Sequence, residues 1–200
     1  MCLWPGKARP MVDKQRIQSA VAAILEAIGA DPVRDGLKDT PQRVARMYEE
    51  LFSGIGMDPK LALDTVFDEE QHQEEVVIVR NVPFYSICEH HLLPFFGKAH
   101  MGYVPDGKIA GASKLARVLE VVARQPQLQE RMTSQIADAI YEVLRPDGVV
   151  VLIEAEHLCM SMRGVKKEGS GIVTSATRGT FDKFGIRRGE LLGLLKGKES

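Results

Sequence analysis

Residues 149–164 read Val-Val-Val-Leu-Ile-Glu-Ala-Glu-His-Leu-Cys-Met-Ser-Met-Arg-Gly. The run at residues 149–153 is apolar and mostly β-branched, which is typical of a buried strand. A histidine and a cysteine, His157 and Cys159, follow within a few residues. This stretch therefore predicts a core strand that ends in side chains able to bind metal or take part in catalysis.

Two helices are predicted before this strand, because apolar side chains recur there at a spacing of three and four residues. They are Leu115, Val118, Leu119 and Val122 in the first helix, and Met132, Ile136, Ile140, Val143 and Leu144 in the second. Pro126 separates the two helices, and residues 146–148 (Pro-Asp-Gly) end the second.

Further strands are predicted on both sides of the helices. Residues 76–79, 97–104 and 108–110 precede the helices, and residues 171–180 follow the core strand. The resulting order is strand, strand, helix, helix, strand, strand. We expect an α+β fold, with four strands in an antiparallel sheet and both helices on one face. Two edges of such a sheet are unpaired in a single chain, so we also expect a homo-oligomer.

The N-terminal part is predicted to be helical. Residues 13–30 carry an amphipathic pattern with Asp13 as N-cap, and Thr40 and Pro41 supply the cap and first turn of a second helix that ends at residues 53–54. The acidic and amide-rich segment 68–75 is predicted to be a linker. We therefore expect a helical region at residues 1–72 and a second domain at residues 73–200.

Composition excludes several classes of protein. The chain is 44% hydrophobic and 26% charged, with no apolar run near the roughly 20 residues that cross a bilayer. Its formal charge of -1 gives no basic excess for nucleic acid or an anionic membrane. Three cysteines, and no secretory pattern in the first ten residues, favour a reducing compartment, and we expect a cytoplasmic protein.

Cysteine and histidine occur together at two places, each at the end of a predicted strand. Cys88 and His91 form one pair, and Cys159 belongs to the other cluster. Either cluster alone is a weak signal, since buried cysteines are common in cores. Together they favour a zinc site with three protein ligands and a fourth position left to water. Zinc-bound water loses a proton near neutral pH, which predicts hydrolytic chemistry.

His90 and His157 remain as imidazoles beside the predicted ligands. Both are suited to proton transfer, although an orienting role or a place in the core is the alternative. Glu89 has two interpretations, a general base or a carboxylate that orients the ligands.

Basic side chains occur where an anion could use them. Ser113, as a predicted N-cap, would put the positive end of a helix beside Lys114 and Arg117, which suits a triphosphate. Arg163 follows Cys159 closely, whereas Arg43 is distant in sequence. Taken singly, each is an ordinary surface charge. Gln129 and Glu130 open the second helix, where Glu130 either interacts with the helix dipole or accepts hydrogen bonds from the amino-imino edge of guanine.

Five stretches of this sequence resemble the GTP cyclohydrolase I family. They are Asp-Thr-Pro-Gln-Arg-Val-Ala at 39–45, Cys-Glu-His-His at 88–91, Gly-Ala-Ser-Lys-Leu-Ala-Arg at 111–117, Gln-Pro-Gln-Leu-Gln-Glu-Arg at 125–131 and Glu-His-Leu-Cys-Met-Ser-Met-Arg-Gly at 156–164. The resemblance covers residues 13 to 195 in the family's order and spacing. The turn at 167–171 and the first ten residues depart from it.

The resemblance implies a tunnelling fold with an N-terminal helical extension, assembled as a homodecamer with active sites between subunits. It implies that GTP and water are the substrates, that the guanine imidazole ring opens at C8 with loss of formate, and that 7,8-dihydroneopterin triphosphate forms. Carried over to this sequence, the Zn²⁺ ligands are Cys88, His91 and Cys159, and the proton-transfer residues are His90 and His157. The substrate contacts are Glu130 and Gln129 for guanine, and Ser113, Lys114, Arg117, Arg163 and, from another subunit, Arg43 for the triphosphate.

Three alternatives remain at this point. A structural zinc module would need a fourth protein ligand, and His157 would have to supply it. A zinc nucleoside deaminase would need His-x-Glu followed by Pro-Cys-x-x-Cys, which this sequence lacks. A regulatory GTP sensor would bind GTP without releasing formate or a pterin.

Overall fold

The computed structural model describes residues 12–68, 76–181 and 188–196. The chain forms two compact units, Met1–Met57 and Asp58–Ser200. This boundary precedes the one at residue 72 that the sequence suggests, because residues 58–68 make contacts within the second unit. The predicted linker at 68–75, with His72, lies almost wholly outside the described residues.

The N-terminal unit is a pair of helices, α1 (Lys14–Ala27) and α2 (Thr40–Leu51). Asp13 caps α1 as predicted, since its carboxylate accepts a hydrogen bond from the Arg16 backbone N–H at 3.0 Å. The prediction that Thr40 caps α2 is wrong. Asp39 takes the cap position without a capping hydrogen bond, and its carboxylate instead pairs with Arg43 at 3.5 Å. An ion pair between Lys14 and Glu49 links the two helices.

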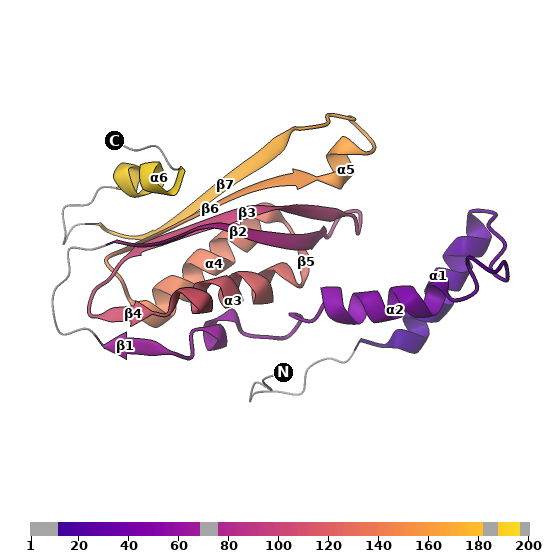
Figure 1. Ribbon diagram of the computed structural model, residues 1–200, viewed down its shortest axis with the longest axis horizontal. Helices are drawn as coiled ribbons and strands as arrows, with labels where there is room; N and C mark the ends of the chain where they lie inside the picture. Colours follow the sequence, from indigo (N-terminus) through magenta and orange to yellow (C-terminus); the bar gives the residue numbers. More distant parts are fainter. Residues whose placement is uncertain (1–11, 69–75, 182–187, 197–200) are drawn as a thin grey trace. The chain divides into compact units, whose positions relative to one another are not determined.

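The second unit is built on a five-stranded sheet in the order β5-β2-β3-β6-β7 (Figure 1). Its strands are β2 (Val77–Cys88), β3 (Pro94–Val104), β5 (Pro126–Gln127), β6 (Gly148–His157) and β7 (Gly171–Gly179). The four long strands pair antiparallel, which confirms the predicted α+β class. The short β5 adds a fifth strand, parallel to β2, that the sequence did not predict. Two residues carry too little periodicity to be recognised.

Two long helices, α3 (Ala112–Ala123) and α4 (Gln129–Leu144), cover one face of this sheet. Their predicted apolar positions are buried except for Val143, which is half-buried, and Val149, Val151 and Ile153 of β6 are buried as well. The predicted order of strands and helices is confirmed, and this layer between helices and sheet is the main core of the unit.

A second, two-stranded sheet joins β1 (Val66–Asp68) to β4 (Lys108–Ala110). The 3₁₀ helix η1 (Pro59–Ala62) lies before it and contacts α3. The sequence predicts β4, which follows the turn residues Pro105, Asp106 and Gly107, but not its partner β1, which has no such turn signal before it.

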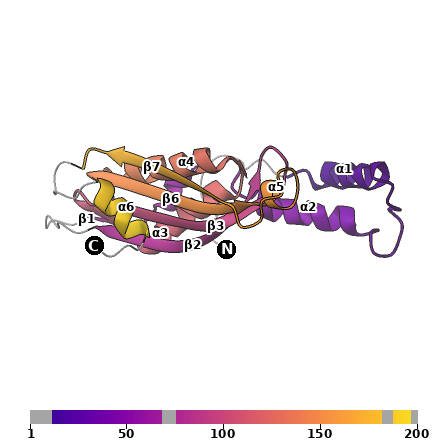
Figure 2. The same cartoon turned by 90° about the horizontal axis from the view of Figure 1, so that it is seen from above.

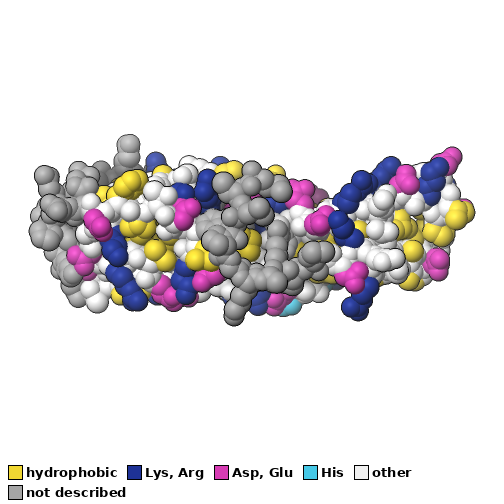
Figure 3. Space-filling view, turned by 90° about the horizontal axis from the view of Figure 1, so that it is seen from below, with side chains coloured by type: hydrophobic (Ala, Val, Ile, Leu, Met, Phe, Trp, Pro, Cys, Tyr) yellow, Lys and Arg dark blue, Asp and Glu magenta, His cyan; other side chains and the backbone are white. Residues whose placement is uncertain are grey.

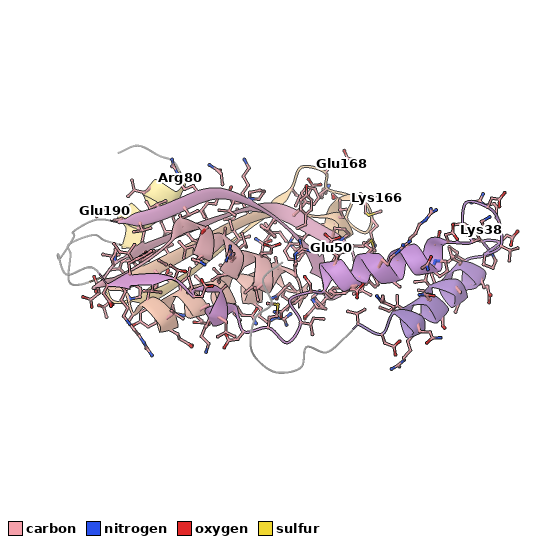
Figure 4. The ribbon with its side chains drawn as sticks, turned by 60° about the horizontal axis from the view of Figure 1, so that its bottom comes forward. Lys38, Glu50, Arg80, Lys166, Glu168 and Glu190 are labelled. Carbon is pink, nitrogen blue, oxygen red and sulfur yellow. The ribbon has the colours of Figure 1, made fainter. Side chains whose placement is uncertain are left out.

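The two predicted helices share one face of the sheet as expected, but the sequence did not predict a helix on the other face. The helix α6 (Arg188–Lys196) lies across the opposite face, as Figure 2 shows. Val150 and Leu152 of β6 pack there against Leu191 and Leu195. Arg80 of β2 also donates to the Leu194 carbonyl at 3.0 Å (Figure 4). The unbroken apolar run of β6 is explained by this arrangement, because both of its faces are covered.

Charges of both signs are interspersed on the face shown in Figure 3, in keeping with a net charge near zero. Among the described residues, the helices are too short or too polar to cross a lipid bilayer.

Replacement of Gly97 by Ala is expected to destabilise the second unit by about 2 kcal/mol or more, because overlap with backbone cannot be relieved by a side-chain rotation. A Cβ at Gly97 would overlap the Glu154 carbonyl oxygen of the paired strand β6. Denaturant unfolding measures the effect. In the control Gly193→Ala the new Cβ meets open space on α6, so stability should rise slightly. Equal stability of Gly97→Ala and the parent would contradict the register of β3 against β6.

Replacement of His100 by Leu is expected to make stability less sensitive to acid. Burial lowers the pKa of His100 on the face covered by α6; Glu154 opposes this effect, and Arg80 and Lys98 add to it. The unfolded chain therefore binds a proton at His100 more readily than the folded chain does. The contribution of neutral His100 to the free energy of unfolding is full above pH 6.5, its pKa in the unfolded chain, and decreases as the pH falls below that value. Unfolding midpoints measured between about pH 7 and about pH 5 should fall less in the variant. Parallel curves for the two proteins would refute this account.

Candidate metal centre and active site

The candidate metal centre lies where two parallel-running strands end. β2 and β6 both pair antiparallel with β3, which lies between them. They therefore run parallel to each other, and their C-terminal ends lie at the same end of the sheet. Cys88 is the last residue of β2, and Cys159 lies in the short helix α5 (Leu158–Ser161) directly after β6. The ligand atoms of Cys88, His91 and Cys159 all lie within 4.8 Å of one another.

A tight turn after β2 presents His91. The Leu92 N–H donates to the Cys88 carbonyl, and the Cys88 N–H donates to the Leu93 carbonyl, each at 2.9 Å. Leu92 adopts φ +51°, in the left-handed region, which closes the turn within a few residues. His91 is thus held above Cys88 by backbone hydrogen bonds.

Arg131 of α4 ties this turn to β5. Its guanidinium pairs with the Glu89 carboxylate and donates to the Pro126 carbonyl at 2.9 Å and to Gln127 Oε1 at 3.2 Å. The hydrogen bond from Arg131 lowers the pKa of Glu89, so this carboxylate stays ionised and is a weak base. The geometry favours the orienting interpretation of Glu89 over the general base.

The three candidate ligands differ in exposure, which leaves one side of the site open. Cys88 is buried, Cys159 is half-buried and His91 is exposed. Within the described residues, no fourth His, Cys, Asp or Glu joins this group. Burial, followed by the nearby Cys88 sulfur, raises the pKa of the Cys159 thiol. Two sulfur donors and one imidazole fit zinc, and a cation would compensate the charge of buried thiolates.

His157, the last residue of β6, is buried beside this group. Its Nε2 lies 2.8 Å from Gln129 Oε1, and its ring stacks on Phe95 with centroids 4.4 Å apart and planes within 6°. Burial lowers the pKa of His157, and the charge of Glu130 opposes that effect. His157 is therefore neutral near pH 7, and Nε2 is already engaged by a protein partner.

The remaining residues of this end differ in accessibility. His90 is exposed, with its ring centroid 6.1 Å from that of His91. Glu130 is exposed at the start of α4, whereas Gln129 beside it is 1% exposed, and its amide is bonded to protein groups. Glu130 is thus open to a ligand, and the Gln129 side chain faces the protein interior.

Two of the predicted phosphate-binding residues, Ser113 and Lys114, lie at the other end of α3, and Arg117 lies at its middle. Ser86 Oγ donates to the Ala123 carbonyl at 2.7 Å, so the end of α3 is the part close to Cys88. Figure 1 shows that α3 begins beside β4. A helix rises 1.5 Å per residue, which puts Ser113 about 15 Å from Ala123. Within one chain, Ser113 and Lys114 therefore lie far from the metal centre, and Arg117 lies between them and the end of α3 that adjoins it.

The prediction that Ser113 caps α3 is wrong, because Gly111 takes the cap position and no side chain caps the helix. Ser113 lies inside the first turn instead. The Lys114 ammonium pairs with the Asp64 carboxylate and, with Arg117, lowers the pKa of Asp64. A phosphate at this position would have to replace Asp64 as the partner of Lys114.

The two remaining arginines are placed differently. The charge of Arg163 acts on the Cys159 thiol, lowering its pKa against the larger effect of burial, so Arg163 lies at the metal end of the sheet. Arg43 belongs to the N-terminal unit, where it pairs with Asp39.

Three interactions at the site were not predicted from the sequence. They are the stacking of Phe95 on His157, the ion pair of Arg131 with Glu89, and the ion pair of Asp64 with Lys114. Each depends on contacts between residues far apart in the chain, for which the local pattern gives no signal. Arg131 lies within one of the family-like stretches, which was the one available indication.

Comparison with known proteins identifies a family. The model of the GTP cyclohydrolase I family matches residues 17–196. GTP cyclohydrolase 1 of Halalkalibacterium halodurans is 60% identical over 187 residues, covering 93% of this chain and 98% of the relative. GTP cyclohydrolase 1 of Carboxydothermus hydrogenoformans is 61% identical over 186 residues, covering 92% and 96%.

Among solved structures, the apo form of the archaeosine synthase QueF-Like aligns with a TM-score of 0.42 and 12% identity, over 56% of this chain and 98% of that one. The family match and the close relatives cover nearly the whole length of both partners. The chain belongs to the GTP cyclohydrolase I family.

Proposed function

We propose that the protein hydrolyses GTP with zinc as cofactor, opening the guanine imidazole ring at C8, releasing formate and forming 7,8-dihydroneopterin triphosphate. This reaction is the first step of folate and pterin biosynthesis, and we place it in the cytoplasm. The observation that carries the proposal is the Cys88, His91 and Cys159 set, open on one side, in a chain of this family.

Cys88, His91 and Cys159 would hold the zinc ion. Bound there with an open position, zinc supplies a water that is activated near neutral pH. The structural-module alternative would require His157 as fourth ligand. His157 Nε2 is bonded to Gln129 at 2.8 Å, and His157 is not part of the ligand group. This geometry favours a catalytic site over a structural one.

The remaining chain groups would bind guanine and move protons. Glu130, exposed at the start of α4, suits the amino and imino groups of guanine, because a carboxylate accepts two parallel N–H bonds. His157 is neutral, and His90 is exposed on the ligand turn. We assign proton transfer to both imidazoles.

The triphosphate would be held by residues of more than one subunit. Along α3, Ser113 and Lys114 lie roughly 14 to 15 Å, and Arg117 roughly 9 Å, from the end that adjoins Cys88. A second copy must therefore bring its α3 to the metal centre, where Arg163 lies, and we assign Arg43 to a further copy. The outer edge of β7 has no strand partner among the described residues, so edge pairing between copies is available. We propose a homodecamer of tunnelling-fold subunits.

The test of the proposal is product analysis together with metal content. Protein purified with zinc and incubated with GTP is expected to release formate and a pterin that fluoresces after oxidation. Chelation should abolish both, and added zinc should restore them. Binding of GTP without either product would identify a sensor and refute the proposal.

Variants of single residues separate catalysis from metal binding. His157→Ala should keep the zinc and lose activity by at least about a hundredfold, the range of general acid-base catalysis. Cys159→Ser should lose both. Loss of zinc from His157→Ala would instead support a structural site with four ligands.

Mixed oligomers test the shared site. Lys114→Ala and His157→Ala should each be nearly inactive alone. When the two variants are co-expressed in equal amounts, about a quarter of the sites contain an intact metal half and an intact phosphate half from different copies. Activity should recover to roughly that level. No recovery in verified mixed oligomers would show that each chain carries a complete site.

A further inference from the structure

We propose that Gln129 is a positioning residue that holds His157 in the tautomer with its proton on Nε2, leaving Nδ1 as the nitrogen that accepts a proton. The role of this tautomer in catalysis rests on the proposed function. Its structural part stands on the hydrogen bonds that surround the Gln129 amide, and it replaces the guanine contact that the sequence suggests for this side chain.

The orientation of the Gln129 amide is determined by backbone carbonyls. Its Nε2 lies 3.1 Å from the Ile153 carbonyl of β6 and 2.9 Å from the Ile172 carbonyl of β7. Carbonyl oxygens only accept hydrogen bonds, so the amide nitrogen must face them. The reversed amide would put a buried oxygen against two carbonyl oxygens, where it would have no donor.

Two threonines complete the same network. The Thr133 hydroxyl donates to the Gln129 backbone carbonyl at 2.7 Å and lies 2.6 Å from the Thr174 hydroxyl. Since the single Thr133 proton is used, Thr174 donates to Thr133. The Thr174 oxygen lies 3.1 Å from Gln129 Nε2 and can only accept, so it shares one of the two amide protons with a carbonyl. Every donor in the network has an acceptor, which fixes the amide further.

The amide orientation fixes the proton on His157. Gln129 Oε1 faces His157 Nε2 at 2.8 Å, and a carbonyl-type oxygen can only accept, so Nε2 must carry a hydrogen. The neutral ring then has its lone pair on Nδ1. No hydrogen bond to Nδ1 is found within residues 12–68, 76–181 and 188–196, and that atom is not among the buried, unpaired ones. Nδ1 is therefore not fully buried, although His157 as a whole is only 9% exposed.

Stacking on Phe95 prevents the ring from exchanging its two nitrogens. The ring planes lie within 6° and the centroids are 4.4 Å apart, so a flip of the imidazole would drive its edge into the Phe95 ring. His157 is thus held in one orientation by Phe95 and in one protonation pattern by Gln129.

The chemical consequence concerns proton transfer. A proton leaving a group in the site would bind Nδ1, while the Nε2 proton stays on its hydrogen bond to Gln129. The same proton would later pass from Nδ1 to a nitrogen of the opening ring, which returns His157 to its starting form. Gln129 would act through His157 and would not touch the substrate.

Neutron diffraction from deuterated crystals of the zinc-loaded protein at about pH 8 tests the tautomer, because ordinary imidazoles are neutral there. A deuteron on His157 Nε2, directed at Gln129 Oε1, with Nδ1 bare, is expected. A deuteron on Nδ1, with or without one on Nε2, would overturn the proposal. The result does not depend on activity, so failure of the proposed function would show separately as absence of formate and pterin.

Kinetics of Gln129→Met test the positioning role, because Met keeps the length of the side chain and removes both the acceptor and the donor. We expect kcat to fall roughly tenfold to a hundredfold, with KM for GTP and zinc content unchanged. Glu130→Gln should instead raise KM. The matched control Gln15→Met, exposed on α1, should match the parent protein. A raised KM with unchanged kcat in Gln129→Met would make Gln129 a guanine contact and overturn the inference.

Discussion

The site depends on the antiparallel pairing of β3 with the two strands that flank it. Because β2 and β6 both run opposite to β3, they run parallel to each other, and their C-terminal ends lie at the same end of the sheet. Phe95 of β3 lies opposite His157, and Ile87 lies opposite Pro94, so the two cysteine-bearing segments begin level with each other. A shift of one residue in either pairing would turn the ligand side chains to the other face of the sheet. The metal geometry is therefore a consequence of strand register.

The same arrangement divides the proposed active site. Because α3 leads from β4 back toward β5, its basic first turn lies far from the metal end, while its last turn contacts Ser86 close to Cys88. In the proposed function a second copy would bring its basic turn of α3 to the metal end of this one. Within the part of the chain that the structure describes, the outer edge of β7 has no strand partner, and such an edge is an aggregation hazard that a closed assembly would remove. Assembly and catalysis would then be one requirement.

Buried groups of the fold also determine the protonation pattern of His157, which lies beside the metal centre. The carbonyls of Ile153 and Ile172, on adjacent strands, orient the amide of a helix residue, and that amide determines which nitrogen of His157 carries the proton. Arg131 acts in a comparable way on the ligand turn, since it holds Glu89 as an ion and joins it to β5. Gln129, which looks suited to binding substrate, thus positions His157, and Glu89, which looks suited to be a base, is held by Arg131 as part of the ligand turn.

The sequence alone determined the order of the main strands and helices, because the periodicity of Leu115 to Val122 and of Met132 to Leu144 depends only on which side chains must be buried. It also indicated the ligand set, since Cys88, His91 and Cys159 are the residue types that zinc prefers. Tertiary structure alone decided the place of α6, the fifth strand and the interior role of Gln129. These features could not be predicted because they arise from contacts between residues distant in the chain, and a local pattern does not record which backbone carbonyl a buried amide will meet.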